Sequence, residues 1–265
     1  MLPTGQMNDI WEFIPFWIGL LYVSFPLNFM VYGWNDMVDL EIDADNPRKD
    51  SYWFGAKGTQ EQLSSLWKPI LIVQLLFFPV IYYFIGLLAI PIFVAFFVVN
   101  SLYNLPKHGF RSKPPLELIC QIGYLLIAPL SIYLNAATHL PWQTYLYLFL
   151  FALQSQLIGE VMDIEPDRKS GRSTSATVLG MKWAKLLIIF IVTVEVSLLF
   201  LIYKEFIFGG MLAVGLLWLI IDLAFVFKTK LYSMRQMKLF ALMSNVVAVV
   251  SMGYVWWSGC LLSVG

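Results

Sequence analysis

Apolar residues gather into long runs along this chain, and short polar segments separate the runs. A helix needs about 20 consecutive apolar residues to cross the hydrocarbon core of a bilayer, close to the length of most of these runs. They predict spans over residues 10–34, 67–87, 88–103, 116–133, 142–162, 183–203, 206–227 and 239–262. We therefore expect an all-α fold, a polytopic membrane bundle of about eight transmembrane helices.

The connections between the predicted spans differ in length. Residues 86–91 and 135–141 are short connections that contain glycine or proline, so the helices they join should pack antiparallel. The connection over residues 35–66 is longer and polar, and Pro47 should break any helix that enters it.

The composition of the chain excludes a soluble domain. Of its 265 residues, 59% are hydrophobic and 13% are charged, whereas about a quarter of the residues in a soluble domain are charged. No polar stretch exceeds roughly 35 residues, which is far below the usual size of a domain. We expect one transmembrane domain over residues 1–265, with neither a nucleic-acid partner nor an obligate protein partner.

The formal net charge is zero, but the basic residues are distributed unevenly. Threading eight spans alternately through a bilayer puts residues 35–66, 104–115, 163–182 and 228–238 on one side. Of the 17 Lys and Arg residues, only Lys204 falls on the other side. Because Lys and Arg accumulate in cytoplasmic loops, these segments should face the cytoplasm of a multi-pass protein of the plasma (inner) membrane.

Two acidic segments follow apolar runs on that same side. The first contains Asn35, Asp36, Asp39 and Asp43, and the second contains Glu160, Asp163 and Asp167. In both segments three carboxylates are spaced i, i+3 and i+7, which places them on one face if a helix continues through them. The two segments resemble the halves of an internal repeat, the arrangement that builds paired sites in membrane proteins.

These carboxylates predict a divalent metal site. Like charges three or four residues apart destabilise a bare helix, so the acids need a compensating cation. Oxygen ligands with no His or Cys nearby favour Mg²⁺, which completes its shell with water and substrate phosphate. The implied substrate is a diphosphate. The alternative is a pair of solvated acidic loops, since most loop carboxylates are solvated.

Basic residues on the same side are candidates for binding the diphosphate oxygens. They are Lys107, Arg111 and Lys113 between the third and fourth spans, and Arg48 and Arg172, each five residues after an acidic segment. The alternative for each is simple positive-inside topology. Residues 171–180, rich in Ser and Thr, either close over a phosphate or cap a following helix.

These motifs resemble those of the UbiA superfamily of intramembrane prenyltransferases. Its NDxxDxxxD motif is matched by residues 35–43, and its DxxxD motif, followed by Gly and Thr, by residues 163–167 with Gly171, Thr174 and Thr177. The resemblance implies a central cavity capped on the cytoplasmic side, and two Mg²⁺ ions that bind an isoprenyl diphosphate used to alkylate a lipophilic acceptor. It makes Asp36, Asp39, Asp43, Asp163 and Asp167 the catalytic carboxylates, with Glu160 as a further metal ligand and Asn35 at the diphosphate.

Within this superfamily, the chain looks most similar to the lycopene elongases of the carotenoid branch. Residues 46–49, Gly159-Glu160 and Asp167-Arg168 carry that similarity, and residues 102–114 are also similar to chlorophyll synthases. The resemblance implies isoprenoid and carotenoid biosynthesis, with transfer of a five-carbon unit to an acceptor such as lycopene. The family usually has nine spans, so this chain would lack the first of them.

Several other functions remain open on the sequence alone. Enzyme alternatives are an aromatic prenyltransferase, acting on a quinone precursor or in the chlorophyll manner, and a UbiA-type terpene cyclase. The non-enzyme alternative is a cation-binding transporter, which would need carboxylates near the membrane midplane. Glu195 and Asp222 lie within predicted spans, where such residues either form hydrogen bonds between helices or line a cavity.

Overall fold

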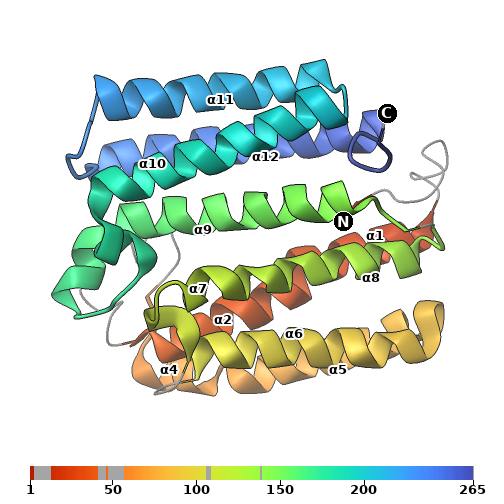
Figure 1. The fold of residues 1–265 in the computed structure, drawn as a ribbon. Helices are drawn as coiled ribbons and strands as arrows, with labels where there is room; N and C mark the ends of the chain where they lie inside the picture. Colours follow the sequence, from red (N-terminus) through yellow and green to blue (C-terminus); the bar gives the residue numbers. More distant parts are fainter. Residues whose placement is uncertain (3–12, 41–45, 47–56, 106–108, 138, 265) are drawn as a thin grey trace. The chain divides into compact units, whose positions relative to one another are not determined.

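The computed structural model describes residues 1–2, 13–40, 46, 57–105, 109–137 and 139–264. Every regular element within these residues is a helix, which confirms the predicted class (Figure 1). In chain order the α-helices are α1 (Ile14–Tyr22), α2 (Asn28–Val38), α4 (Gln60–Ser65), α5 (Trp67–Ile85), α6 (Ala89–Asn104), α7 (Leu116–Ile119), α8 (Ile127–Leu134), α9 (Trp142–Lys169), α10 (Ser175–Ser197), α11 (Phe206–Ala224) and α12 (Met234–Ser258).

Shorter helical turns connect some of these elements. Two are π-helical, η2 (Val23–Leu27) between α1 and α2 and η6 (Leu198–Ile202) after α10. Three are 3₁₀ turns: η3 (Gly86–Leu88), η4 (Phe110–Ser112) and η5 (Cys120–Leu126).

Within the described residues, seven stretches are long and apolar enough to cross a membrane. The 45-residue stretch Gln60–Asn104 holds both α5 and α6, and each of the other six corresponds to one predicted span. Each of the eight predicted spans is therefore found as a helix or a run of helical turns.

A turn at Gly86 separates α5 from α6. Gly86 has φ 59° and ψ −140°, a backbone conformation that side chains with a Cβ rarely adopt. Glycine can reverse the chain here without strain, so α5 and α6 pack side by side in opposite directions (Figure 1). The tight turn predicted at residues 86–91 is confirmed.

The contacts divide the chain into two compact units, each with its own apolar core. Unit 1 comprises Met1–Phe110 and Gly123–His139, and its core joins α1, α2, α5, α6 and α8. There the hydroxyl of Tyr22 donates to Gln74 Oε1 at 3.0 Å, and Gln74 Nε2 donates to the carbonyl of Pro26 at 2.7 Å. Gln74 thus joins α5 to the turn η2, as expected for a polar residue that bridges membrane helices.

Unit 2 comprises Arg111–Ile122 and Leu140–Gly265. Its core is formed mainly by α9 and α10, with Leu157, Val161 and Ile164 of α9 facing Ala184 and Ile188 of α10. In contrast, α12 is largely exposed and contributes only Val255 to the buried residues. Apolar side chains on such outer faces suit contact with lipid.

Candidate acidic and basic site

The first acidic motif lies at the end of α2 in unit 1. Asn35 and Asp36 are half-buried in the last turn of this helix, which ends at Val38. Asp39 is 2% exposed and follows directly, with φ −92° and ψ 8°. The α-helix needed to put all three aspartates on one face therefore ends before Asp39. Asp43 and Arg48 lie outside the described residues.

The second acidic motif lies within one continuous helix in unit 2. α9 runs through Glu160, Asp163 and Asp167 to Lys169, although Pro166 lacks the N–H that would continue the hydrogen-bond ladder. Glu160 is 5% exposed and Asp167 is 4% exposed, while Asp163 is half-buried. The common face predicted from the spacing is therefore observed for this motif.

Both carboxylate oxygens of Glu160 accept hydrogen bonds from the protein. Gln156 Nε2 donates to Oε1 at 3.0 Å, and the backbone N–H of Ala176 donates to Oε2 at 3.1 Å. Each oxygen keeps a further acceptor site, because a carboxylate has about four lone-pair positions. Metal coordination by Glu160 thus stays a prediction, and the residue also joins α9 to the start of α10.

Asp167 fixes the turn that follows α9. Its carbonyl accepts from the backbone N–H of Arg172 at 2.8 Å and from the hydroxyl of Ser170 at 3.0 Å. Its carboxylate oxygen Oδ2 accepts from the hydroxyl of Thr174 at 3.4 Å. Residues 170–174 are therefore held directly against the end of the acidic motif.

Two of the predicted diphosphate-binding residues meet beside this turn. Arg172 Nη2 donates to the carbonyl of Arg111 at 3.4 Å, and both side chains are half-buried. Guanidinium groups are well suited to phosphate oxygens, which they bind in a fork. Lys113 lies nearby in the sequence and is exposed, while Lys107 lies outside the described residues.

Residues 171–180 form the start of a helix. Thr174 is the N-cap of α10, and Thr174 and Thr177 each accept the other's backbone N–H in a capping box. Of the two interpretations offered by the Ser/Thr-rich sequence, the helix cap is confirmed.

Glu117 belongs to the same cluster but to none of the predicted motifs. It lies in α7, is 0% exposed, and its Oε1 accepts the backbone N–H of Ser175 at 2.6 Å. The available signal was a single acid within the apolar run 116–133, where an ionisable side chain is costly.

The chemistry of the acidic residues fits Mg²⁺. Among the described residues, no group of three or more His, Cys, Asp and Glu side chains is arranged to hold a metal ion. Mg²⁺ does not require such a cage, because it usually binds one or two carboxylates and completes its shell with water and substrate phosphate. Asp163 and Asp167, one turn apart on α9, offer oxygen donors of that kind.

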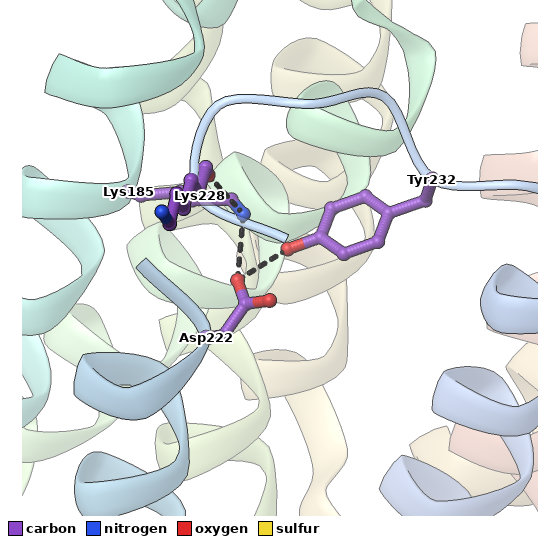
Figure 2. Close-up of polar contacts among 4 residues, drawn as sticks. All are labelled: Lys185, Asp222, Lys228 and Tyr232. Carbon is purple, nitrogen blue, oxygen red and sulfur yellow. Dashed lines mark hydrogen bonds and ion pairs between the residues drawn. The ribbon is translucent and has the colours of Figure 1, made fainter. Parts of the chain in front are cut away.

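A separate polar cluster joins α10, α11 and the loop after α11 (Figure 2). Lys185 Nζ donates to Asp222 Oδ2 at 2.6 Å and to the carbonyl of Lys228 at 2.9 Å. The hydroxyl of Tyr232 donates to the same carboxylate oxygen at 2.7 Å. Burial, together with this hydrogen bond, raises the pKa of Tyr232 well above its ordinary value, so the hydroxyl stays a donor. For Asp222, the hydrogen-bonding interpretation is confirmed.

Comparison with known proteins identifies relatives of the chain. Residues 1–246 match the UbiA prenyltransferase family. A solved UbiA homologue from Archaeoglobus fulgidus, bound to GPP and Mg²⁺, superposes with a TM-score of 0.63 at 16% sequence identity. That alignment covers 97% of this chain and 90% of the homologue, so the two share a fold.

The chain is also similar to proteins named lycopene elongase/hydratase. The one from Corynebacterium glutamicum is 26% identical over 188 residues, which are 69% of this chain and 63% of that protein. The one from Halobacterium salinarum is 29% identical over 205 residues, 71% of this chain and 70% of the relative. The matched region thus spans less than two thirds of the Corynebacterium protein.

Proposed function

Because the chain belongs to the UbiA prenyltransferase family and is an integral membrane enzyme, we propose that it moves an isoprenyl group from an allylic diphosphate to a lipophilic acceptor, with Mg²⁺ as cofactor. The observation that carries this proposal is the arrangement in unit 2, where the acidic face of α9 ends beside Arg172 and Arg111. Carboxylates for a metal and guanidinium groups for phosphate oxygens are the two needs of a diphosphate site. The solved homologue bound to GPP and Mg²⁺ supports the same chemistry.

The proposed metal ligands come from both acidic motifs. They are Asp36, Asp39 and Asp43 of the first motif and Glu160, Asp163 and Asp167 of the second. Bound there, Mg²⁺ would neutralise the charge that develops on the departing diphosphate. Six further residues bind the diphosphate oxygens and orient the leaving group: Asn35, Arg48, Lys107, Arg111, Lys113 and Arg172.

The reaction breaks the allylic C–O bond, and its electron pair leaves with the diphosphate. A π bond of the acceptor attacks the allylic carbon, and the acceptor then loses a proton. Water must be excluded while the carbocation exists, because it would capture the cation. Aromatic ring faces stabilise such a cation, and 17% of the residues in this chain are aromatic.

We propose a carotenoid as the acceptor, because relatives at 26–29% identity are named lycopene elongase/hydratase. The proposed substrates are a five-carbon allylic diphosphate as donor and lycopene as acceptor. The enzyme would act in the plasma membrane, with its acidic loops on the cytoplasmic side. An aromatic acceptor and cyclisation of the diphosphate itself are the competing reactions.

The acceptor is tested by incubating membranes that contain the enzyme with labelled dimethylallyl diphosphate and lycopene. The expected product is a labelled carotenoid that is five or ten carbons longer. Release of diphosphate without a longer carotenoid would exclude the carotenoid assignment. A labelled cyclic hydrocarbon formed without lycopene would favour cyclisation.

The metal ligands are tested with Asp39→Ala and Asp163→Ala in the same membranes. Removing either carboxylate should lower Mg²⁺-dependent diphosphate release by about 100-fold, as expected when a metal ligand is lost. Glu165→Gln is the matched control, because Glu165 is exposed on α9 and pairs with Lys169 at 2.9 Å. Unchanged release in both aspartate variants would refute the assignment of these motifs to metal.

A further inference from the structure

Side chains from three segments accept hydrogen bonds from the first three backbone N–H groups of α10. The bonds run from Ser175 to Glu117 Oε1 (2.6 Å), from Ala176 to Glu160 Oε2 (3.1 Å) and from Thr177 to Thr174 Oγ1 (3.3 Å). The first N–H groups of a helix have no partner within the helix, so these three acceptors complete its start. Two of them come from other helices, one from α7 and one from α9.

This first turn needs external acceptors because it is separated from the rest of α10. Gly180 has φ 76° and ψ 162°, which breaks the helical path five residues after Ser175. A single helical turn is not stable by itself, since nucleation fixes several residues for one hydrogen bond. The position of residues 175–179 is therefore set by their contacts with α7 and α9.

Burial of the Glu117 carboxylate is expected to lower the stability of the fold. It is completely buried, and its Oε2 makes no hydrogen bond within the described part of the chain. The next residue, Leu118, packs in the apolar core with Leu157 and Val161. A buried carboxylate with a partly unsatisfied head costs stability, and an acid kept in a membrane helix usually has a functional role.

A chain of contacts leads from Glu117 to the acidic motif. Glu117 holds Ser175, which directly follows Thr174, and the hydroxyl of Thr174 donates to Asp167 Oδ2 at 3.4 Å. The turn between Asp167 and Thr174 also carries Arg172, whose guanidinium reaches the carbonyl of Arg111. Movement of Ser175 would therefore shift both a predicted metal ligand and a predicted diphosphate ligand.

We propose that Glu117 is a positioning residue of the diphosphate site. It fixes the turn at residues 170–175 and so sets the orientation of the Asp167 carboxylate and the Arg172 guanidinium. This inference rests on the proposed function, because it assigns metal binding to the second acidic motif. Loss of groups that orient metal ligands typically weakens metal binding by about 10- to 100-fold.

The test uses Mn²⁺ as the probe and measures its binding to the full-length purified protein by electron paramagnetic resonance. Glu117→Ala should weaken Mn²⁺ binding by about tenfold. Glu117→Gln should bind Mn²⁺ nearly as well as the wild type, because the amide oxygen can still accept the Ser175 N–H. Glu165→Gln, at an exposed position on the same acidic helix, should leave binding unchanged.

Ser175→Pro removes the same hydrogen bond from its donor side and guards against misfolding of Glu117→Ala. Proline suits the first position of a helix, and Thr174 already has the extended conformation (φ −126°, ψ 164°) that proline requires of its predecessor. Ser175→Pro should weaken Mn²⁺ binding as Glu117→Ala does. The double variant should bind Mn²⁺ no more weakly than either single variant, because both substitutions remove the same hydrogen bond.

Hydrogen exchange of residues 170–179 provides a readout that does not depend on metal. Faster exchange there in Glu117→Ala, with protection restored in Glu117→Gln, supports the proposal when the Mn²⁺ results agree. Normal Mn²⁺ binding in Glu117→Ala and Ser175→Pro, while Asp163→Ala abolishes it, would overturn the proposal and leave the proposed function standing. Normal binding in both Asp39→Ala and Asp163→Ala would instead reject the proposed function, and this inference with it.

Discussion

The Glu160 side chain serves two needs, because it holds the start of α10 and is also a proposed metal ligand. Glu160→Gln keeps an oxygen for the N–H of Ala176 but removes the negative charge. We expect the Mg²⁺ concentration for half-maximal diphosphate release to rise about tenfold, with little change in melting temperature. A titration of activity with Mg²⁺ measures this shift.

Gln156→Leu is the control for that substitution. It removes the 3.0 Å hydrogen bond to Glu160 Oε1 but leaves the carboxylate intact. The Mg²⁺ requirement should therefore rise less than in Glu160→Gln, because the charged ligand remains and only a group that orients it is lost. If Glu160→Gln lowered the melting temperature and left the Mg²⁺ requirement unchanged, Glu160 would be a structural acceptor and not a ligand.

At the scale of single residues, the sequence could identify the acids of α9 but not the way they are held. The i, i+3, i+7 spacing is a local property of a helix, so the common face of Glu160, Asp163 and Asp167 could be predicted. The bond between Glu117 and Ser175 joins residues 58 positions apart, and no local pattern predicts such a pair. The meeting of Arg111 and Arg172 is likewise a product of tertiary structure.

The capping box is the local device that starts α10. Thr174→Val removes the hydroxyl that accepts the Thr177 N–H and donates to Asp167. Loss of an N-cap typically costs about 1 kcal/mol, so the variant should unfold at a lower temperature in detergent. Thr174→Ser keeps the hydroxyl and should restore the wild-type melting temperature. Equal melting temperatures for the valine variant and the wild type would contradict the role of this cap.

The pair of Lys185 and Asp222 joins α10 to α11, and both side chains are at most 5% exposed (Figure 2). Removing one partner leaves a buried charge unpaired, which typically costs about 3 to 5 kcal/mol. Lys185→Met and Asp222→Leu should each strongly destabilise the protein, as measured by thermal unfolding in detergent. The double variant should be more stable than either single variant, because it contains no unpaired buried charge.

At the scale of helices, the sequence predicts which segments are helical better than it predicts where each helix begins and ends. Hydrophobic run length predicts each span that the described residues contain, because the bilayer imposes that length on any crossing helix. It could not predict that α2 ends at Val38 or that a helical turn precedes Gly180. The start of α10 depends on its cap and on two acceptors from other helices, Glu117 and Glu160.

At the scale of the whole molecule, the unequal distribution of basic residues predicts the orientation of the chain in the membrane. The loop and first turns around the start of α12 carry Lys228, Lys230, Arg235 and Lys238, while the end of that helix near Ser258 has no basic residue. Positively charged segments are retained in the cytoplasm during insertion. The start of α12 should therefore be cytoplasmic and its end should be external.

Single cysteines at the two ends of α12 test this orientation in a background where Cys120 and Cys260 are replaced by serine. Lys230→Cys and Ser258→Cys are both exposed positions outside the proposed site. A membrane-impermeant maleimide should label Ser258→Cys in right-side-out vesicles and Lys230→Cys in inverted vesicles. The opposite labelling would place the acidic segments on the external face, where a diphosphate made in the cytoplasm could not reach them. That result would reject the predicted orientation but not the proposed metal site. Asp163→Ala would still lower diphosphate release when substrate is supplied to both faces of the membrane.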